Sequence, residues 1–338
     1  MLGCNTMESA ITVLMPNYNN EKFLKEAIDS VLNQTFKNFI FLIVDDGSTD
    51  IGIEIINSYS DSRIVLLKKE NNSGIVDSLN LGLEKINTKY FIRMDGDDIS
   101  TPDRFQLLYD FMEKNPNIGV CGSNIMTFGN SNELWKYSTS KDKIKARLIF
   151  NGGVGHASCI FRTMVLKNNT IQYSNTYPYM EDYDLFSRLK AVTDFANIDK
   201  ALYYYRILEH NSTVKNIHSI FDRYRNIYKK IISELNIDIN QKNIEIHLEF
   251  FIKSTISFKI KEYKEYVDFL IEKNKENKIY PIIAFSEILH EKWEQLFFKI
   301  VPLSLSQSLS YFLLSRNISI NQLKYLVKFK INKLVGRK

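Results

Sequence analysis

Carboxylates that could bind a hard cation or transfer a proton cluster behind a short apolar run of this chain. In "FIRMDGDDIS" three of them, Asp95, Asp97 and Asp98, fall within four residues. Like charges this close repel one another and resist burial, so a fold tolerates them as a solvated turn or around a cation. Asp and Gly are ordinary turn formers, and a plain turn is therefore the alternative interpretation.

Two further acidic clusters share this pattern. In "FIFLIVDDGSTD" an apolar run leads straight into Asp45 and Asp46, and "YPYMEDYDLFSRL" offers Glu181, Asp182 and Asp184 at the start of an apparent helix. The alternative for both clusters is capping, because acidic side chains stabilise the first turn of a helix. The placement of the clusters in the fold has to decide between these interpretations.

Alternating strands and helices would position these carboxylates over the first 110 or so residues. The apolar runs "ITVLMP", "FIFLIV", "SRIVLLKK" and "KYFIRM" predict strands, and "EKFLKEAIDSVLNQ" and "IVDSLNLGLEKI" have helical periodicity. Such alternation predicts an α/β fold with a doubly wound, largely parallel sheet. Sheets of this kind bind ligands beyond the carboxyl ends of their strands, which is where Asp46 and Asp97 fall.

The composition is that of a globular protein without a strong charge bias. Of 338 residues 44% are hydrophobic, enough to build one large domain or two smaller ones. Lys and Arg number 44 against 39 Asp and Glu, an excess too small to indicate a nucleic-acid partner. The three cysteines have no CxxC or metal-ligand spacing, and the N-terminus has no secretory signal, which together predict a cytoplasmic protein with reduced thiols.

From about residue 215 the pattern changes, and only helices are expected over 215–338. Beyond Glu294 there is no acidic residue. Basic residues accumulate there instead: Lys299, Arg316, Lys324, Lys328, Lys330, Lys333, Arg337 and Lys338. The apolar stretch "FFKIVPLSLSQSLSYFLL" contains a lysine and a proline and is not expected to cross a membrane.

The last predicted helix is both basic and amphipathic. In "NQLKYLVKFKINKLVGRK" the residues recurring at helical spacing are Leu323, Leu326, Val327, Ile331 and Leu334. Such a helix can lie on an anionic membrane surface, which would make the protein peripheral on the inner face of the cytoplasmic membrane. The alternatives are packing on its own domain or on a second subunit of a homo-oligomer.

Three motifs occur in a fixed order: "ITVLMPNYNNEKFLKEAIDSVLNQTFKNFIFLIVDDGSTD", "NNSGIVDSLNLGL" and "YFIRMDGDDISTPDRF". This sequence resembles glycosyltransferase family 2, the inverting sugar-nucleotide transferases with the GT-A fold. The resemblance is dense over residues 11–106, patchier to about residue 213, and extends less specifically to bacterial lipooligosaccharide, capsule and O-antigen enzymes. It implies a mixed, mainly parallel sheet flanked by helices, in a catalytic domain over 1–214 with a nucleotide-sugar half (about 8–110) and an acceptor half (111–214).

A nucleotide sugar presents a base, a diphosphate and an anomeric carbon, each of which needs a different side chain. An aromatic ring such as Tyr18 can pack on the base or ribose, and the resemblance assigns the imide N–H of uracil to Asp46. Many family members have Ala-Arg-Asn where this chain reads "SLN", so Arg93 or Arg104 is expected at the diphosphate. The predicted nucleotide-sugar site comprises Pro16, Tyr18, Asp46, Gly74, Arg93, Asp95 and Asp97.

The DxD pattern Asp95-Gly96-Asp97 supplies hard oxygen ligands, which suit Mn²⁺ or Mg²⁺. The resemblance implies that Asp97 is the direct ligand and that Asp95 lies nearer the ribose or reaches the metal through water. It also places the base that deprotonates the acceptor hydroxyl at Asp182. Glu181 is the alternate base or an acceptor-orienting residue.

We therefore predict a metal-dependent inverting glycosyltransferase of bacterial surface polysaccharide or lipopolysaccharide synthesis. The expected donor is UDP-GlcNAc, UDP-GalNAc or UDP-Gal, and the expected acceptor is a saccharide or a lipid-linked saccharide. One alternative is a non-catalytic sugar-nucleotide-binding subunit, against which the presence of both Asp97 and Asp182 argues. The other is a sugar nucleotidyltransferase, which would usually carry a Gly-rich basic loop where this chain has "MPNYNNEKF".

Overall fold

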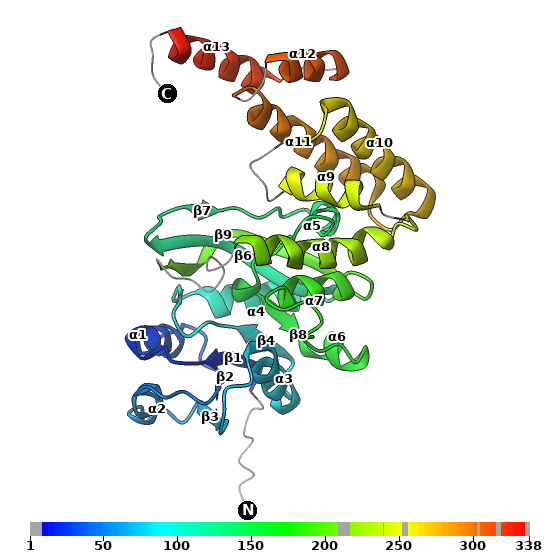
Figure 1. The fold of residues 1–338 in the computed structure, drawn as a ribbon. Coiled ribbons are helices and arrows are strands. Elements are labelled where there is room, and N and C mark those ends of the chain that lie inside the picture. The colour runs from blue at the N-terminus through cyan, green and yellow to red at the C-terminus, as the bar shows by residue number, and fades with distance from the viewer. Residues whose placement is uncertain are drawn as a thin grey trace, which may run out of the picture. The chain divides into compact units, whose positions relative to one another are not determined.

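The computed structural model describes residues 9–208, 217–238, 240–251, 256–302, 305–315 and 319–334. The chain divides into two compact units, Met1–Asn216 and Ile217–Lys338 (Figure 1). The first unit holds all the strands of the described chain, and the described part of the second is helical. That the first unit is the catalytic domain stays a prediction.

Four apolar runs form the parallel half of the sheet in the first unit. They are β1 (Ile11–Asn17), β2 (Phe39–Asp45), β3 (Ile64–Lys68) and β4 (Tyr90–Arg93). All neighbours in the order β3-β2-β1-β4 are parallel. Every residue of β1 and β4 is buried, as expected of strands that are covered on both faces.

The helices between these strands follow from the apolar spacing of the sequence. They are α1 (Glu21–Leu32), α2 (Gly52–Asn57) and α3 (Ile75–Lys85). In α1 the buried residues are Leu24, Ala27, Ile28 and Val31, one stripe of a helix. The periodicity predicts α1 and α3, whereas α2 was not predicted because six residues are too few to show a period.

The second half of the unit extends the same sheet with mixed pairing. Its strands are β5 (Ile99–Ser100), β6 (Ile118–Gly129), β7 (Leu134–Trp135), β8 (Ile160–Arg162) and β9 (Asp194–Ile207). Its helices are α4 (Arg104–Lys114), α5 (Lys141–Arg147), the 3₁₀ turn η1 (His156–Ser158), α6 (Thr163–Asn168) and α7 (Glu181–Leu189). Beyond β4 the order is β8-β6-β9-β5, with β6 and β9 parallel and the other neighbours antiparallel, while β7 pairs with β6. The predicted mixed sheet flanked by helices is confirmed.

The second unit contains the helices expected from the changed sequence pattern. They are α8 (Ile217–Ser233), α9 (Gln241–Phe251), α10 (Ile260–Asn277), α11 (Ile282–Ile300), α12 (Leu305–Leu314) and α13 (Ile320–Leu334). Aromatic rings join them, as where Trp293 of α11 stacks on Tyr311 of α12 with ring centroids 4.7 Å apart. Of the helices that the structure describes, none combines the length and the apolar character needed to cross a membrane.

Candidate active site

The two adjacent aspartates at the end of β2 have different surroundings. The Asp45 carboxylate is fully buried and accepts hydrogen bonds from Asn17 Nδ2 (2.8 Å), the Ser48 amide (3.0 Å) and Ser48 Oγ (2.6 Å). These bonds close the turn after β2 and tie it to the end of β1. Asp45 is therefore a structural residue of the turn, and Asp46 makes a separate set of contacts.

Asp46 lies against the N-terminus of α3. Its Oδ1 accepts from Lys69 Nζ (2.5 Å) and the Ser73 amide (3.0 Å), and its Oδ2 accepts from the Gly74 amide (2.8 Å). Burial would raise the pKa of Asp46, but these hydrogen bonds outweigh it and lower the pKa, so the carboxylate stays ionised at neutral pH. Lys69 Nζ also lies 2.5 Å from Asp77 Oδ1. Lys69 is missing from the predicted site, although its position just after a strand end was a signal for it.

The other residues predicted to bind the base and ribose lie at the same edge of the sheet. Tyr18 follows β1 with 44% of its surface exposed, which leaves its ring open to a ligand. Gly74 precedes α3 with φ +93°, a left-handed conformation that favours glycine, and a Cβ built there would meet no atom within 4 Å. Pro16 is buried inside β1 in register with Val44, and its contact with a base stays a prediction.

The turn after β4 gathers the predicted metal ligands. Nη1 of Arg93, a residue that is only 3% exposed, lies 2.5 Å from Asp95 Oδ1. Burial, and then the charge of Asp95, raises the pKa of Asp97 to about 6. Burial, and then the charges of Asp95 and Asp97, raise the pKa of the fully buried Asp98 well above its ordinary value. Negative charge thus collects at this turn in a form that a bound cation would stabilise.

Strand β9 holds this acidic turn in place. The Arg206 amide donates to Asp98 Oδ1 (2.7 Å), and Arg206 Nε donates to the carbonyl oxygen of Asp97 (2.7 Å). The Asp95 amide donates to the hydroxyl of the buried Tyr203 (3.1 Å). The conformation of the DxD turn is therefore fixed by a strand more than 100 residues further along the chain.

Gly96 allows the DxD turn to approach the segment that follows β1. A Cβ at this position would lie 2.9 Å from Asn20 Nδ2 and 3.2 Å from Asn17 Oδ1, closer than side-chain atoms ordinarily come. A larger residue would have to displace the Asn20 or Asn17 side chain. The pairing of β1 with β4 brings the carboxyl ends of the two strands together, and glycine leaves room for these asparagines beside the DxD turn.

The two arginines expected at the diphosphate have different environments. Arg104 is fully buried, with Nη1 donating to Ser100 Oγ (2.8 Å) and Nη2 to the carbonyl oxygens of Arg93 and Ala157 (both 2.8 Å). Burial lowers the pKa of Arg104 to about 10, so the side chain stays charged at neutral pH. The expectation that Arg104 contacts the diphosphate is wrong, because its guanidinium is used to join β4 to η1. Arg93 remains the candidate.

The predicted catalytic pair lies at the start of α7. Asp182 Oδ1 accepts from the Tyr183 amide (2.7 Å), whereas Glu181 Oε2 is buried without a hydrogen-bond partner among the described residues. Burial, and then the charge of Asp182, raises the pKa of Glu181 to about 7, and burial likewise raises the pKa of Asp182. Arg93 opposes both shifts and Asp95 adds to both. The fold therefore brings the DxD turn and the α7 pair into one electrostatic environment around Arg93.

Asn80 of α3 positions the segment that leads to this pair. Its Nδ2 donates to the Tyr173 carbonyl oxygen (3.0 Å), and its Oδ1 accepts from the Tyr173 amide (2.9 Å). The Tyr173 hydroxyl lies 2.7 Å from His156 Nε2. Burial lowers the pKa of His156 well below its ordinary value, and the charge of Arg93 acts in the same direction, so the imidazole is neutral. Asn80 and Tyr173 are 93 residues apart, so no local pattern could have revealed this clamp.

The acidic turn fits a cation that is held partly by its substrate. In the described part of the chain no group of three or more His, Cys, Asp and Glu side chains is arranged to hold a metal ion. Mg²⁺, however, is commonly bound by one or two carboxylates together with substrate phosphates and water. Asp95 and Asp97 provide such a donor set, and the raised pKa of Asp97 shows that its negative charge lacks full compensation.

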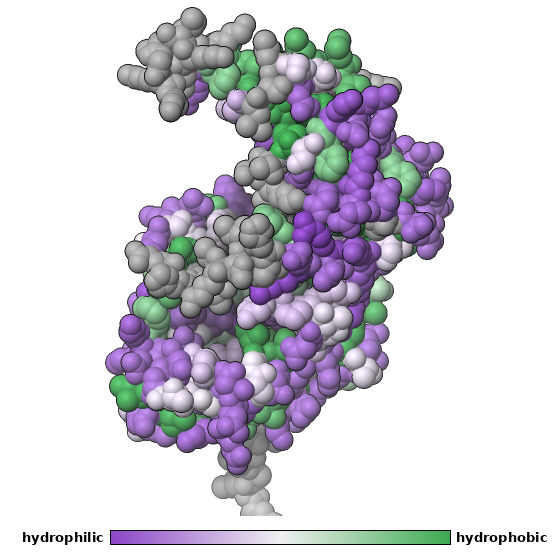
Figure 2. Space-filling model, in the orientation of Figure 1, coloured by the Kyte–Doolittle hydropathy of each residue, from purple (hydrophilic) through white to green (hydrophobic). Residues whose placement is uncertain are grey.

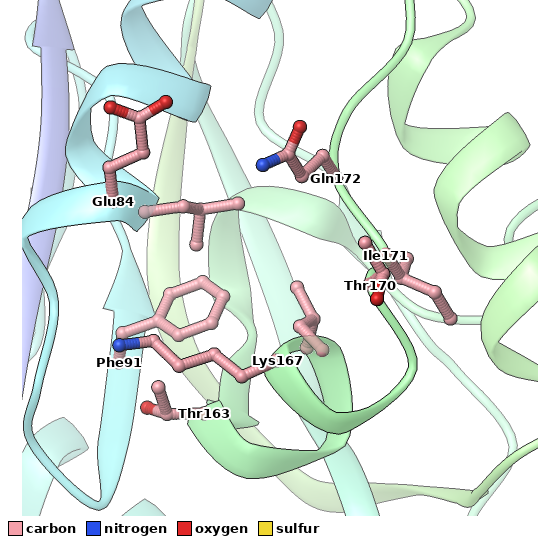
Figure 3. Close-up of a pocket in the computed structure, with 9 residues that line it drawn as sticks. Glu84, Phe91, Thr163, Lys167, Thr170, Ile171 and Gln172 are labelled. Carbon is pink, nitrogen blue, oxygen red and sulfur yellow. The ribbon is translucent and has the colours of Figure 1, made fainter.

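A cavity of about 210 Å³ involves none of these residues. It lies beside α3, β4 and α6 (Figure 3) and is lined by Leu83, Glu84, Phe91, Thr163, Leu166, Lys167, Thr170, Ile171 and Gln172. Lys167 Nζ is already engaged, since it donates to the Ile86 carbonyl oxygen (2.5 Å) and Asn87 Oδ1 (3.0 Å). We assign no part of the nucleotide-sugar site to this cavity.

Comparison with known proteins decides the family. The model of "Glycosyl transferase family 2" matches residues 12–169. A Haemophilus influenzae protein described as an uncharacterized glycosyltransferase is 30% identical over 255 residues, which cover 70% of this chain and 76% of that protein. The chain belongs to glycosyltransferase family 2. The family match includes Asp46 and the DxD turn and ends before α7, so Glu181 and Asp182 lie outside it.

A second relative has a more specific description. It is the Escherichia coli protein WfgD, described as a UDP-Glc:alpha-D-GlcNAc-diphosphoundecaprenol beta-1,3-glucosyltransferase. This protein is 30% identical over 177 residues, which cover 52% of this chain and 68% of WfgD. The similarity is therefore concentrated in part of the chain.

Solved structures share the fold of this family 2 member. Residues 1–349 of S. aureus TarS in complex with UDP-GlcNAc give a TM-score of 0.59 at 19% identity, covering 89% of each chain. The Pyrobaculum calidifontis mannosyltransferase PcManGT, in complex with GDP-Man and Mn²⁺, gives a TM-score of 0.53 at 12% identity, covering 91% of this chain and 86% of that one. At such identities the likeness shows the fold alone, and it confirms the predicted GT-A-like architecture with a helical C-terminal region.

Proposed function

We propose that this family 2 member is a metal-dependent, inverting glycosyltransferase with its catalytic domain in residues 1–214. The observation that carries the proposal is the placement of the DxD turn and the Glu181–Asp182 pair around the buried Arg93. Two acidic groups with raised pKa values beside one arginine are what a site needs to bind a diphosphate-bound cation and to deprotonate a hydroxyl.

The donor is proposed to be a UDP-sugar: UDP-GlcNAc, UDP-GalNAc or UDP-Gal. Asp46 stays ionised and uses three hydrogen bonds, which leaves acceptor capacity for the imide N–H of uracil. Tyr18 is exposed beside it for stacking on the base or ribose. The name of WfgD, which mentions UDP-Glc, supports a UDP-sugar as donor for this chain.

Transfer is proposed to be a single displacement at the anomeric carbon. The acceptor hydroxyl oxygen attacks the anomeric carbon. On the opposite side of that carbon, the bond between the carbon and the diphosphate oxygen breaks, and the nucleoside diphosphate leaves with the bonding electron pair. Asp182 takes the proton of the hydroxyl, and Glu181 orients the acceptor. When bound at Asp97 and Asp95, Mn²⁺ or Mg²⁺ would neutralise the diphosphate and stabilise the charge developing on it. Arg93 would add a further positive charge on the diphosphate side.

The acceptor is proposed to be a saccharide or a lipid-linked saccharide of bacterial surface polysaccharide or lipopolysaccharide synthesis. The enzyme would then act in the cytoplasm or at the inner face of the cytoplasmic membrane. The description of WfgD, whose acceptor is a diphosphoundecaprenol-linked sugar, supports this class of acceptor.

A hydrolysis screen of UDP-, GDP- and dTDP-sugars tests the proposed donor class. We expect release of UDP from one or more UDP-sugars with Mn²⁺ or Mg²⁺, and none in EDTA. Binding of UDP without hydrolysis or transfer under any condition would favour a non-catalytic binding subunit. Formation of a nucleotide sugar from a nucleoside triphosphate and a sugar phosphate would identify a nucleotidyltransferase.

Asp46→Asn is expected to weaken UDP binding by about tenfold, the scale of one hydrogen bond to a charged group. The asparagine keeps the shape of the side chain but loses the charge that the uracil N–H and Lys69 require. Titration calorimetry with UDP measures the effect. Asp77→Asn is the matched control, since Asp77 also pairs with Lys69 but is not proposed to contact uracil, and the UDP affinity of this variant should change by less than about twofold. Equal losses in both variants would assign the effect to Lys69.

Transfer is expected to rise with pH, because the base Asp182 must be ionised before it can accept the acceptor proton and burial raises its pKa. The pKa of the neighbouring Glu181 is raised to about 7, so Glu181 adds a negative charge beside Asp182 as pH increases. In Glu181→Gln the negative neighbour of Asp182 is removed, and the ascending limb should move to lower pH. Profiles of kcat/KM against pH for wild type and for Glu181→Gln give the position of the ascending limb in each protein. A limb at the same pH in wild type and variant would show that another group titrates.

A further inference from the structure

Helix α13 uses one face to pack on its own unit. The Tyr325 ring lies 5.1 Å from the Phe298 ring of α11, measured between centroids. Gln322 is fully buried and its Nε2 donates to the Tyr311 hydroxyl of α12 (2.9 Å). The packing that the sequence left as an alternative is therefore present, and it occupies the Gln322–Tyr325 side of the helix.

A second apolar stripe of α13 is left exposed. Ile320, Leu323 and Val327 follow one another at spacings of three and four residues and are 71%, 50% and 60% exposed. Together with Lys324 and Lys328 they line a shallow, open hollow of about 410 Å³. Of the apolar stripe predicted for this helix, Leu323 and Val327 are thus exposed, whereas the packed face carries Gln322 and Tyr325.

Helix α12 adds exposed leucines in the same unit. Leu309 and Leu313, one helical turn apart, are 58% and 88% exposed. Figure 2 shows green, apolar surface over α12 and the start of α13. We call the exposed set the α12–α13 surface: Leu309, Leu313, Ile320, Leu323, Lys324, Val327 and Lys328. Exposed apolar side chains gathered on neighbouring helices in this way call for a partner.

The two charged residues of this surface, Lys324 and Lys328, are both basic. No Asp or Glu follows Glu294 in the sequence, so Lys324 and Lys328 have no acidic residue nearby along the chain. Lys299 does not belong to the surface, because its Nζ donates to the Glu249 carbonyl oxygen (2.7 Å) and burial lowers its pKa. The sequence groups Lys299 with the basic residues of the tail, and the structure shows that it is engaged inside the helical unit instead. Arg316, Arg337 and Lys338 lie outside the described residues, as do the side chains of Lys330, Ile331, Lys333 and Leu334.

We propose that the α12–α13 surface docks on an anionic lipid bilayer. Apolar side chains at this spacing would enter the boundary between headgroups and acyl chains, while Lys324 and Lys328 contact the anionic headgroups. A second copy of the chain fits less well, because a symmetric contact through this face would bring the same lysines toward one another. Docking would hold the enzyme near an acceptor that cannot leave the membrane.

Co-sedimentation with vesicles tests the proposal on the full chain, with no need for activity. We expect wild type to bind vesicles of equal parts phosphatidylglycerol and phosphatidylcholine, to release as salt is added, and to bind pure phosphatidylcholine much more weakly. Lys324→Gln with Lys328→Gln should lower the partition coefficient by about 30-fold, since each lysine near an anionic surface contributes a factor of about five. Leu323→Ser with Val327→Ser should lower it by about tenfold or more.

Point variants are preferable to truncation, because deleting α13 would expose the residues under Gln322 and Tyr325. The matched control is Lys229→Gln with Lys261→Gln, which removes two exposed charges from α8 and α10 of the same unit and should bind as wild type does. No binding by wild type, or equal loss in the control, would overturn the proposal. Self-association of wild type that the Leu323–Val327 variant abolishes, without vesicle binding, would identify a second copy as the partner instead. UDP binding is read separately, so failure here is distinguishable from failure of the proposed transferase function.

Discussion

Replacing Asp182 by asparagine is expected to lower the rate of sugar transfer by roughly 10²-fold or more, the scale of general-base catalysis. Asparagine keeps the size of the side chain and can still accept the hydrogen bond from the Tyr183 amide, but it cannot take the acceptor proton. UDP affinity should stay close to that of wild type, because the donor contacts are proposed at other residues. Steady-state transfer rates and UDP titrations on the same preparation measure the two quantities.

The stability of the Asp182 variant gives a second readout. Burial raises the pKa of Asp182, so ionising this group costs stability in the folded state, and that cost is present above the folded-state pKa and absent below the unfolded value of about 4. Asp182→Asn should therefore have an equal or higher Tm at about pH 8, with the difference shrinking toward about pH 4. Lower UDP affinity with unchanged turnover would make Asp182 a binding residue. A larger rate loss in Glu181→Gln than in Asp182→Asn would move the base to Glu181.

Asp97→Asn is expected to remove metal-dependent turnover, with a rate loss of about 10²- to 10³-fold, as when one preorganised electrostatic partner of a transition state is lost. The neutral amide is a poorer ligand for a hard cation than the carboxylate it replaces. Wild type in EDTA should lose a similar factor and recover when Mn²⁺ or Mg²⁺ is restored, whereas the variant should not recover. UDP affinity measured with and without metal provides a readout besides activity, because the metal should strengthen binding to wild type only.

Asp103→Asn is the control for this variant. Asp103 precedes α4, is partly exposed, and pairs with Lys200 and Thr101 rather than with a predicted site residue, so turnover with metal should change little. Full activity of wild type in EDTA would rule out the metal assignment, as would a metal response of Asp97→Asn equal to that of wild type. Thermal melts of both variants show whether the fold is retained.

The sequence by itself determined the order of the elements around the site. The runs that form β1, β2 and β4 are mostly apolar up to a polar last residue, which is the pattern of strands that a parallel sheet covers on both faces. Each acidic cluster either follows a strand directly or begins a helix. Asp46, Asp97 and Asp182 could therefore be selected without knowing the tertiary structure. The order of the motifs was also sufficient to indicate the family that the comparisons show.

The tertiary structure alone decided which contacts these residues make. Asp45 and Asp46 are neighbours of one type, and both are buried, yet Asp45 accepts from Asn17 whereas Asp46 accepts from Lys69. Arg93 and Arg104 lie in the same stretch of sequence and are both buried, yet Arg93 pairs with Asp95 whereas Arg104 donates to Ser100 and to two backbone carbonyl oxygens.

The C-terminal helices follow the same logic. Lys299 looked like part of a basic tail and is buried, whereas Leu323 and Val327 looked like one stripe with Leu326 and are exposed. Local periodicity records that a residue is apolar or charged. Which neighbour covers it depends on contacts between elements far apart in the chain, such as the 93 residues from Asn80 to Tyr173, and those contacts have no signature in any single segment.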